Sequence, residues 1–150
     1  MKELSQKLLR TVESAEPRLR KISERESTTP MLPGGWSSKQ VIGHLIDSAS
    51  NNHQRFVRAS LQDSLDFPGY DQDGWVRVQA VSEADWLTLV ALWASYNRHL
   101  AYVIAHLPAS KLETMCRIGS GEPVTLRFLA NDYFAHLVHH LNQIGAADSK

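Results

Sequence analysis

The feature that most constrains the fold is a long apolar run near the C-terminus, from Leu126 to Ile144, which contains neither Pro nor Gly. At 3.6 residues per turn this run predicts a helix with one continuous stripe: Leu126, Leu129, Tyr133, His136, Leu137, His140 and Ile144. His136 and His140 lie one turn apart on that stripe, where Cβ atoms approach to about 6 Å. Two such imidazoles can bind one cation, or they can be hydrogen-bonded histidines of the core or surface. A third ligand from elsewhere in the chain would decide between these interpretations.

Three further amphipathic segments accompany this one, and turn-rich connections separate them. We expect four main helices, at residues 3–23, 38–62, 82–106 and 126–145. Pro17 should kink or interrupt the first helix. A loop is expected over residues 24–35, and a non-helical connection of unusual length follows the second helix, from residue 62 to residue 81. The sequence therefore predicts an all-α fold, a four-helix bundle in a single domain over residues 1–150, with a small hairpin or irregular loop just before the last helix.

Polar residues mark where three of these helices begin. Ser37 or Ser38 is the expected N-cap of the second helix, and Thr125 that of the fourth. Ser82, with Asp85 three positions later, resembles a capping arrangement for the third.

The composition excludes several classes of function. The chain has 16 Lys+Arg and 16 Asp+Glu, so it carries no positive surplus to attract nucleic acid or anionic lipid. No run approaches the length of about 18 apolar residues that a membrane span requires, and the N-terminus lacks the apolar region of a signal peptide. The single cysteine, Cys116, excludes an internal disulfide and fits a reducing compartment. We therefore expect a cytoplasmic protein that binds neither nucleic acid nor membranes.

The second expected helix carries two histidines that are candidates for the third ligand, His44 and His53. On a helical wheel the apolar centre of this segment lies near Leu45, Ala49 and Phe56. His44 lies along one edge of that centre, together with Arg55, while His53 falls nearer the apolar side. Periodicity alone does not choose between the two histidines.

Three groups of residues resemble motifs of the DinB/YfiT-like family of metal-binding four-helix bundles. The first is Gly35-Trp36-Ser37, followed by Gly43-His44-Leu45-Ile46-Asp47-Ser48, Asn51 and Arg55-Phe56. The second is Tyr70-Asp71 with Trp75, and the third is His136-x3-His140 within a His-x-x-His-His-x-x-Gln-Ile pattern. By this resemblance His44, His136 and His140 are the metal-binding histidines, and the bundle has up-down-down-up topology. His53 is then a helix-surface or pocket residue.

Three neutral imidazoles leave a divalent ion with at least one open position, as in catalytic zinc sites. That position can hold water, a substrate oxygen or an external thiolate, and bound Zn²⁺ lowers the pKa of its water to about 7. Imidazole also suits other metals, so the ligand set does not name the ion; zinc and nickel are the ions that we expect. Asp47 or Asp132 is placed to orient an imidazole, although each can equally be a solvated surface acid.

Several other polar residues are candidates to contact a substrate. Asn51 and Arg55 lie along the edge shared with His44, and Asp71 and Trp75 are placed to close over the open metal position. Trp75 is equally consistent with plain core packing. We expect Asp47, Arg55 and Asp71 to be the catalytic or substrate-contacting residues. Cys116 is a poor nucleophile candidate because no helical register places it near the histidines.

The family resemblance implies a metal-dependent thiol S-transferase that uses bacillithiol, mycothiol or glutathione, or a related hydrolase. In either case the substrate is a small electrophilic molecule, and in the first case a low-molecular-weight thiol is the co-substrate. The alternative is a non-catalytic metal-binding bundle of a stress response. Members of the family often dimerise through bundle helices, so the resemblance also implies a homodimer.

Overall fold

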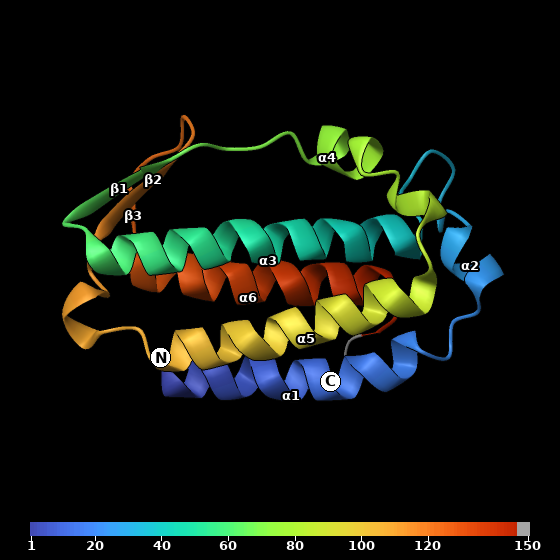
Figure 1. Cartoon of the computed structure of the whole chain (residues 1–150), viewed down its shortest axis with the longest axis horizontal. Coiled ribbons are helices and arrows are strands. Elements are labelled where there is room, and N and C mark those ends of the chain that lie inside the picture. Colours follow the sequence, from blue (N-terminus) through green and yellow to red (C-terminus); the bar gives the residue numbers. More distant parts are fainter. Residues whose placement is uncertain (147–150) are drawn as a thin grey trace.

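A computed structural model describes residues 1–146 of the chain. Its main elements are four long helices, α1 (Lys2–Leu19), α3 (Ser38–Leu61), α5 (Trp86–Ala105) and α6 (Leu126–Gln143). α1 packs against α5 and α6, and α3 packs against the same two helices. α1 and α6 run in one direction while α3 and α5 run in the other (Figure 1). The expected four-helix bundle with up-down-down-up topology is therefore confirmed.

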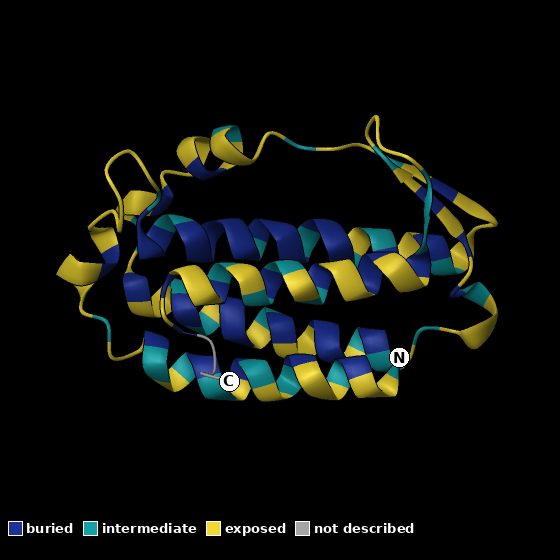
Figure 2. Cartoon of the chain, turned by 180° about the vertical axis from the view of Figure 1, so that it is seen from behind, coloured by how far each residue is buried: buried dark blue, intermediate teal, exposed yellow. Residues whose placement is uncertain are grey.

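The apolar stripes of the four helices form one core. Each helix contributes fully buried side chains, among them Leu8, Val12, Ile42, Phe56, Trp93, Leu100, Leu126 and Leu137. α1, α5 and α6 each carry a buried inner face and an exposed outer face, whereas residues 38–53 of α3 include no exposed residue (Figure 2). Burying each large apolar side chain contributes about 1.5–3 kcal/mol. The core also holds a polar pair, in which the Tyr133 hydroxyl donates to Oδ1 of Asn97 at 2.5 Å.

The helix starts follow the residues that cap them. At α3, Ser37 accepts from the Gln40 N–H and the Gln40 side chain accepts from the Ser37 N–H, which is a full capping box. At α6, Thr125 accepts from the N–H of Phe128, as expected. The expected start of the third helix at residue 82 was wrong, because Asp85 caps α5 by accepting from the N–H of Thr88.

The connections between the long helices hold short elements that were not predicted. Residues 24–35, expected to be a loop, contain α2 (Glu24–Thr28). The connection from α3 to α5 contains β1 (Ser64–Phe67), α4 (Gln72–Val78) and the 3-10 turn η1 (Val81–Glu83). α1 ends at Leu19, two residues after Pro17, rather than at residue 23. One or two helical turns are too short to show an apolar repeat, so periodicity could not identify α2 and α4.

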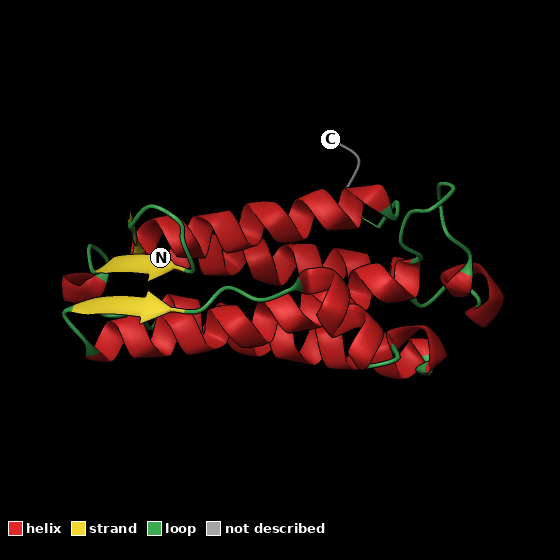
Figure 3. Cartoon of the chain, turned by 90° about the horizontal axis from the view of Figure 1, so that it is seen from above, coloured by secondary structure: helices red, strands yellow, loops and turns green. Residues whose placement is uncertain are grey.

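A three-stranded sheet covers one end of the bundle (Figure 3). β2 (Met115–Ile118) pairs antiparallel with β3 (Val124–Thr125), which confirms the hairpin before the last helix. β2 also pairs in parallel with β1, placing Leu65 beside Cys116. Both side chains are buried. Cys116 is thus a core residue of this end, and burial raises the pKa of its thiol.

The connection from β1 to η1 runs along α3 (Figures 1 and 3). The two segments are in close contact at Gly43, where an added Cβ would overlap the side chain of Val81. Glycine is therefore required here for space, at the residue before His44. None of the helices in the described range is both long and apolar enough to cross a membrane.

Candidate metal centre

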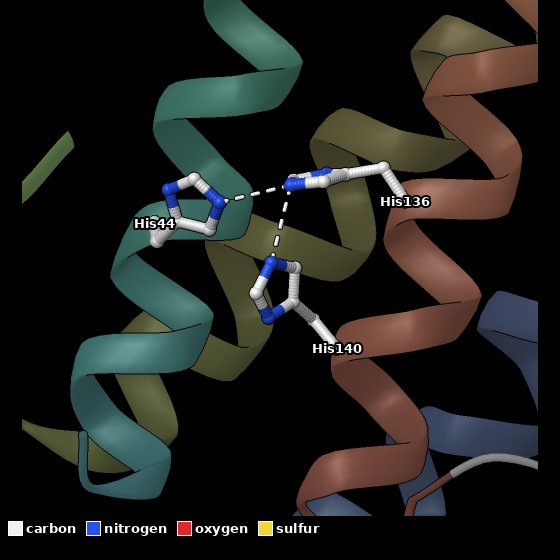
Figure 4. A group of neighbouring side chains, drawn as sticks. All are labelled: His44, His136 and His140. Atoms are coloured by element: carbon white, nitrogen blue, oxygen red, sulfur yellow. Dashed lines mark hydrogen bonds between the residues drawn. The ribbon is translucent and has the colours of Figure 1, made fainter. Parts of the chain in front are cut away.

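Three histidines from two antiparallel helices converge within the bundle. His44 of α3 and His136 and His140 of α6 point toward one another (Figure 4). Nε2 of His136 lies 3.1 Å from Nε2 of His44 and 3.1 Å from Nε2 of His140. Imidazole nitrogens about 2.1 Å from a tetrahedral zinc ion lie about 3.4 Å from one another. Two of the nitrogen spacings therefore fit one shared ion, and candidate ligand atoms of the three rings all lie within 4.8 Å of one another.

The surroundings of the three rings favour the neutral imidazoles that a metal requires. His44 is fully buried, and burial, reinforced by the two other histidines, lowers its pKa to about 4. Burial likewise lowers the pKa of His136 to about 4 and lowers that of His140. Near pH 7 all three rings are therefore uncharged and keep a nitrogen lone pair available.

Gln143 fixes the orientation of His140. Its side-chain oxygen lies 2.8 Å from Nδ1 of His140, and because an amide oxygen only accepts, that nitrogen carries the proton. Nε2 of His140 is then the nitrogen with the free lone pair, and it is the one that faces His136. The Gln143 amide nitrogen in turn donates to Nε2 of His139 at 3.1 Å. The role of Gln143 was missed from the sequence, although its position three residues after His140 places it on the same helix face.

Within the described residues, neither of the two carboxylates expected to orient the histidines bonds one of them. Asp47 is buried, and its oxygens accept from the Gln79 side chain at 3.0 and 3.1 Å. Burial raises the pKa of this carboxyl, and the bond from Gln79 opposes the rise. Asp132 is exposed on α6. Nδ1 of His44 is buried and has no hydrogen-bond partner within residues 1–146. Neither carboxylate therefore accepts a hydrogen bond from this nitrogen.

The structure resolves the choice between the two histidines of α3. His53 lies at the contact with α5, where its Nδ1 is 3.2 Å from the Tyr96 hydroxyl and its ring is 5.1 Å from that of His99. It is therefore apart from the triad, and His44 is the residue that joins it. The Trp36 ring lies 5.1 Å from the His44 ring, which brings the start of α3 against the site.

Two cavities of different character adjoin the triad. One, of about 580 Å³, is largely apolar and is lined by Met31, Leu32, Gly35, Trp36, Val41, His140 and Gln143. The other, of about 270 Å³, is more polar and touches His136. Because α3 and α6 are antiparallel, the first lies toward the start of α3 and the second toward its end. An ion held by the triad is thus flanked by space on both sides.

The expected substrate residues divide between the polar cavity and its surroundings. Arg55 and Asp132 line the cavity, as does Tyr70 from the connection before α4. Asp71 is exposed and caps α4 by accepting from the N–H of Gly74 at 3.0 Å. Trp75 is 39 % exposed and packs on Tyr70, so it is no core residue. Catalytic roles for Asp47, Arg55 and Asp71 stay predictions.

Comparison with known proteins supports the fold and the kind of site. The protein from Bacillus subtilis (strain 168) named "Putative metal-dependent hydrolase YfiT" is 24% identical over 148 residues, covering 95% of this chain and 83% of that protein. A relative from Bacillus mycoides (strain KBAB4), whose name gives the same assignment, is 25% identical over 126 residues, covering 84% and 72% of the two chains.

The solved structure of YfiT, described as "a probable metal-dependent hydrolase with an unusual four-helix bundle topology", has the same fold. It matches with a TM-score of 0.69 at 22% identity, covering 98% of this chain and 91% of that chain. The family model of the DinB superfamily matches residues 7–144. Since that match spans all four long helices and the three histidines, this chain belongs to the DinB superfamily.

Proposed function

We propose that this protein is a metal-dependent enzyme that hydrolyses a small electrophilic substrate, with His44, His136 and His140 holding a divalent ion. The observation that carries the proposal is the convergence of three neutral Nε2 atoms between two cavities. Structural zinc sites use four protein ligands and are closed, whereas three ligands beside open space are typical of catalytic sites. The names of the relatives, which describe metal-dependent hydrolases, point in the same direction.

The residues of the chain prepare the site in three ways. A divalent ion with an open position lowers the pKa of a coordinated water or thiol and polarises a substrate oxygen. Burial keeps the histidines neutral, and Gln143 holds His140 with Nε2 available. Trp36, from the start of α3, shields the His44 side from solvent.

Thiol transfer is the second reaction that such a site can perform, and it follows from the family resemblance. Cys116 cannot supply the thiol, because its side chain is buried on the inner face of β2 and burial raises its pKa. A transferase would therefore take bacillithiol, mycothiol or glutathione from solution as co-substrate. Zinc and nickel remain the ions that we propose.

The test is a turnover assay with defined metal content. Metal-free protein is reloaded with zinc or nickel and given activated esters and alkylating electrophiles, in water alone and with each thiol. We expect turnover that requires the metal, is lost in His136→Ala and is retained in the matched control His99→Ala, whose side chain is exposed on α5. Consumption of thiol would assign transfer, and turnover in water alone would assign hydrolysis. No turnover by fully loaded protein with either nucleophile would refute the enzyme and favour a non-catalytic metal-binding bundle.

A further inference from the structure

We propose that the polar cavity beside His136 binds a carboxylate group of the substrate, and that Arg55 is the residue that recognises it. This inference rests on the proposed function, because it assigns the end of the substrate that lies away from the reacting group. It narrows the substrate class to small electrophiles that carry a carboxylate.

Arg55 is a half-buried cation that forms no ion pair with any residue of the described range 1–146. Within the described residues, its Nε is buried without a hydrogen-bond partner. Its Nη1 donates to Oδ1 of Asn52 at 3.4 Å, which is long for such a bond. Burial lowers the pKa of the guanidinium, and the Phe67 ring lies 5.6 Å below it. A partly desolvated guanidinium is best compensated by two parallel bonds to a planar anion, which is the geometry of a carboxylate.

The walls of the cavity suit a ligand with an anionic end. Arg55 and Asn52 approach from α3, and Tyr70 approaches from the connection that runs along α3. Burial, helped by Asp47, raises the pKa of Tyr70 to about 12, so its hydroxyl keeps its proton and can donate to an anion. The cavity therefore offers a cation and neutral donors in a space of about 270 Å³, enough for a small molecule.

The position of Arg55 relative to the triad sets the length of the ligand. At 1.5 Å per residue, the backbone of Arg55 lies about 16 Å from that of His44 along α3. The same cavity touches both Arg55 and His136. A ligand with its carboxylate on Arg55 therefore places an atom several bonds away beside the histidines.

The charge of the opposite wall favours a carboxylate over a phosphate. Asp132 of α6 also lines the cavity, and its charge acts on Arg55 by raising the guanidinium pKa against the effect of burial. Both residues line the same cavity, but the ion pairs found within residues 1–146 do not include either of them. A monoanion neutralises Arg55 without a second charge, whereas a phosphate dianion adds repulsion from Asp132.

Three matched probes test this assignment: benzoate, its neutral counterpart benzamide, and the dianion phenyl phosphate. Their dissociation constants are measured by calorimetry on metal-free and on zinc-loaded protein. In both forms of the protein we expect benzoate to bind about tenfold tighter than benzamide, because one charge-assisted hydrogen bond contributes about that much affinity. Benzoate should also bind tighter than phenyl phosphate. Arg55→Met should abolish the preference, and Arg55→Lys should keep part of it. Arg58→Met is the control, since Arg58 is exposed one turn further along α3 and bonds Gln54.

Several outcomes would overturn the proposal. They are equal binding of benzoate and benzamide, a preference that survives Arg55→Met, or tighter binding of phenyl phosphate. A preference that appears only with zinc and survives Arg55→Met would assign the carboxylate to the ion instead. Binding is measured without turnover, so an Arg55-dependent preference in a protein that turns over nothing would refute the proposed enzyme and leave the carboxylate site standing.

Discussion

His140 depends on Gln143 as much as on its own place in the helix. The side-chain oxygen of Gln143 accepts from Nδ1 of His140 and so keeps Nε2 free to bind an ion. Gln143→Ala should therefore weaken metal affinity about tenfold, since loss of such partners costs 10- to 100-fold. Gln143→Glu should retain affinity, because a carboxylate accepts the same bond. Competition with a chromophoric chelator measures both, and equal loss in the exposed neighbour Asn142→Ala would show that the effect is not specific to this bond.

The three ligands themselves should behave alike. His44→Ala, His136→Ala and His140→Ala should each strip the metal, because two remaining imidazoles hold an ion far less tightly than three. His53→Ala and His99→Ala should keep full metal, as their rings contact each other rather than the triad. His139→Ala should keep it with lower affinity, since His139 accepts from Gln143. Elemental analysis of the purified variants decides, and full metal in His44→Ala would contradict the assignment.

The lowered histidine pKa values also make the metal-free fold sensitive to acid. The pKa values of His44 and His136 are about 4 in the fold, against about 6.5 in an unfolded chain. Between these values the unfolded chain binds more protons, so the free energy of unfolding decreases as pH falls. Each histidine accounts for up to about 1.4 kcal/mol per pH unit within this window.

Urea unfolding of the metal-free protein at pH 7.5, 5.5 and 4.5 measures this loss. His44→Gln, which removes one titrating ring, should show a shallower decrease between pH 7.5 and 4.5 than the parent chain. A free energy of unfolding that stays constant or increases over that range would show that the rings are not held neutral by burial.

Among the elements, the contact between η1 and α3 constrains the site most directly. Gly43→Ala would place a methyl group on the Val81 side chain, and overpacking of this kind costs about 1–3 kcal/mol. The higher helix propensity of alanine stabilises the fold by at most about 1 kcal/mol, which is less than this cost. We therefore expect a lower melting temperature, with reduced metal affinity because His44 is the next residue. In the Gly43→Ala/Val81→Ala double variant, the melting temperature and the metal affinity should both partly recover. If the two substitutions instead lowered the melting temperature additively, the steric explanation would be excluded.

The long helices and the hairpin before α6 could be predicted from the sequence, whereas α2, β1 and α4 could not. α3 and α6 present several turns of apolar repeat and begin at Ser37 and Thr125, whose side chains cap them as expected. β1 is held by its pairing with β2, which lies beyond α5 in the chain. The stability of β1 therefore depends on a strand that is distant in sequence, and local periodicity cannot reveal such a pairing.

The same distinction holds for the site. His136 and His140 could be paired from their spacing alone, because one helix places them. The choice of His44 over His53 depends on how α3 is rotated against α6, which the wheel left open and the family resemblance supplied. The contact of Asp47 with Gln79 joins α3 to the connection that follows it and depends on tertiary structure in the same way. The contact of Asp71 with Gly74 is a local helix cap.

For the whole molecule, an ion that binds only the folded chain should stabilise it. At a free metal concentration 100 times the dissociation constant the gain is about 2.7 kcal/mol. The melting temperature should therefore rise with zinc concentration in the parent chain and in His99→Ala. It should stay constant in His136→Ala. An equal rise in that variant would show that zinc stabilises the protein through some other site.

The separation of the ligands in sequence gives the ion a further role. His44 and His136 are 92 residues apart in the chain, and the intervening stretch includes the sheet strands and all of α5. Closing a flexible loop of 92 residues costs about 4 kcal/mol of chain entropy. Folding brings His44 and His136 together before the ion binds, so ion binding does not carry this entropy cost. The ion then acts as a reversible cross-link between distant parts of one polymer. Of the three ligands, an unfolded chain keeps only His136 and His140 close together, so loss of the ion is coupled to separation of α3 from α6.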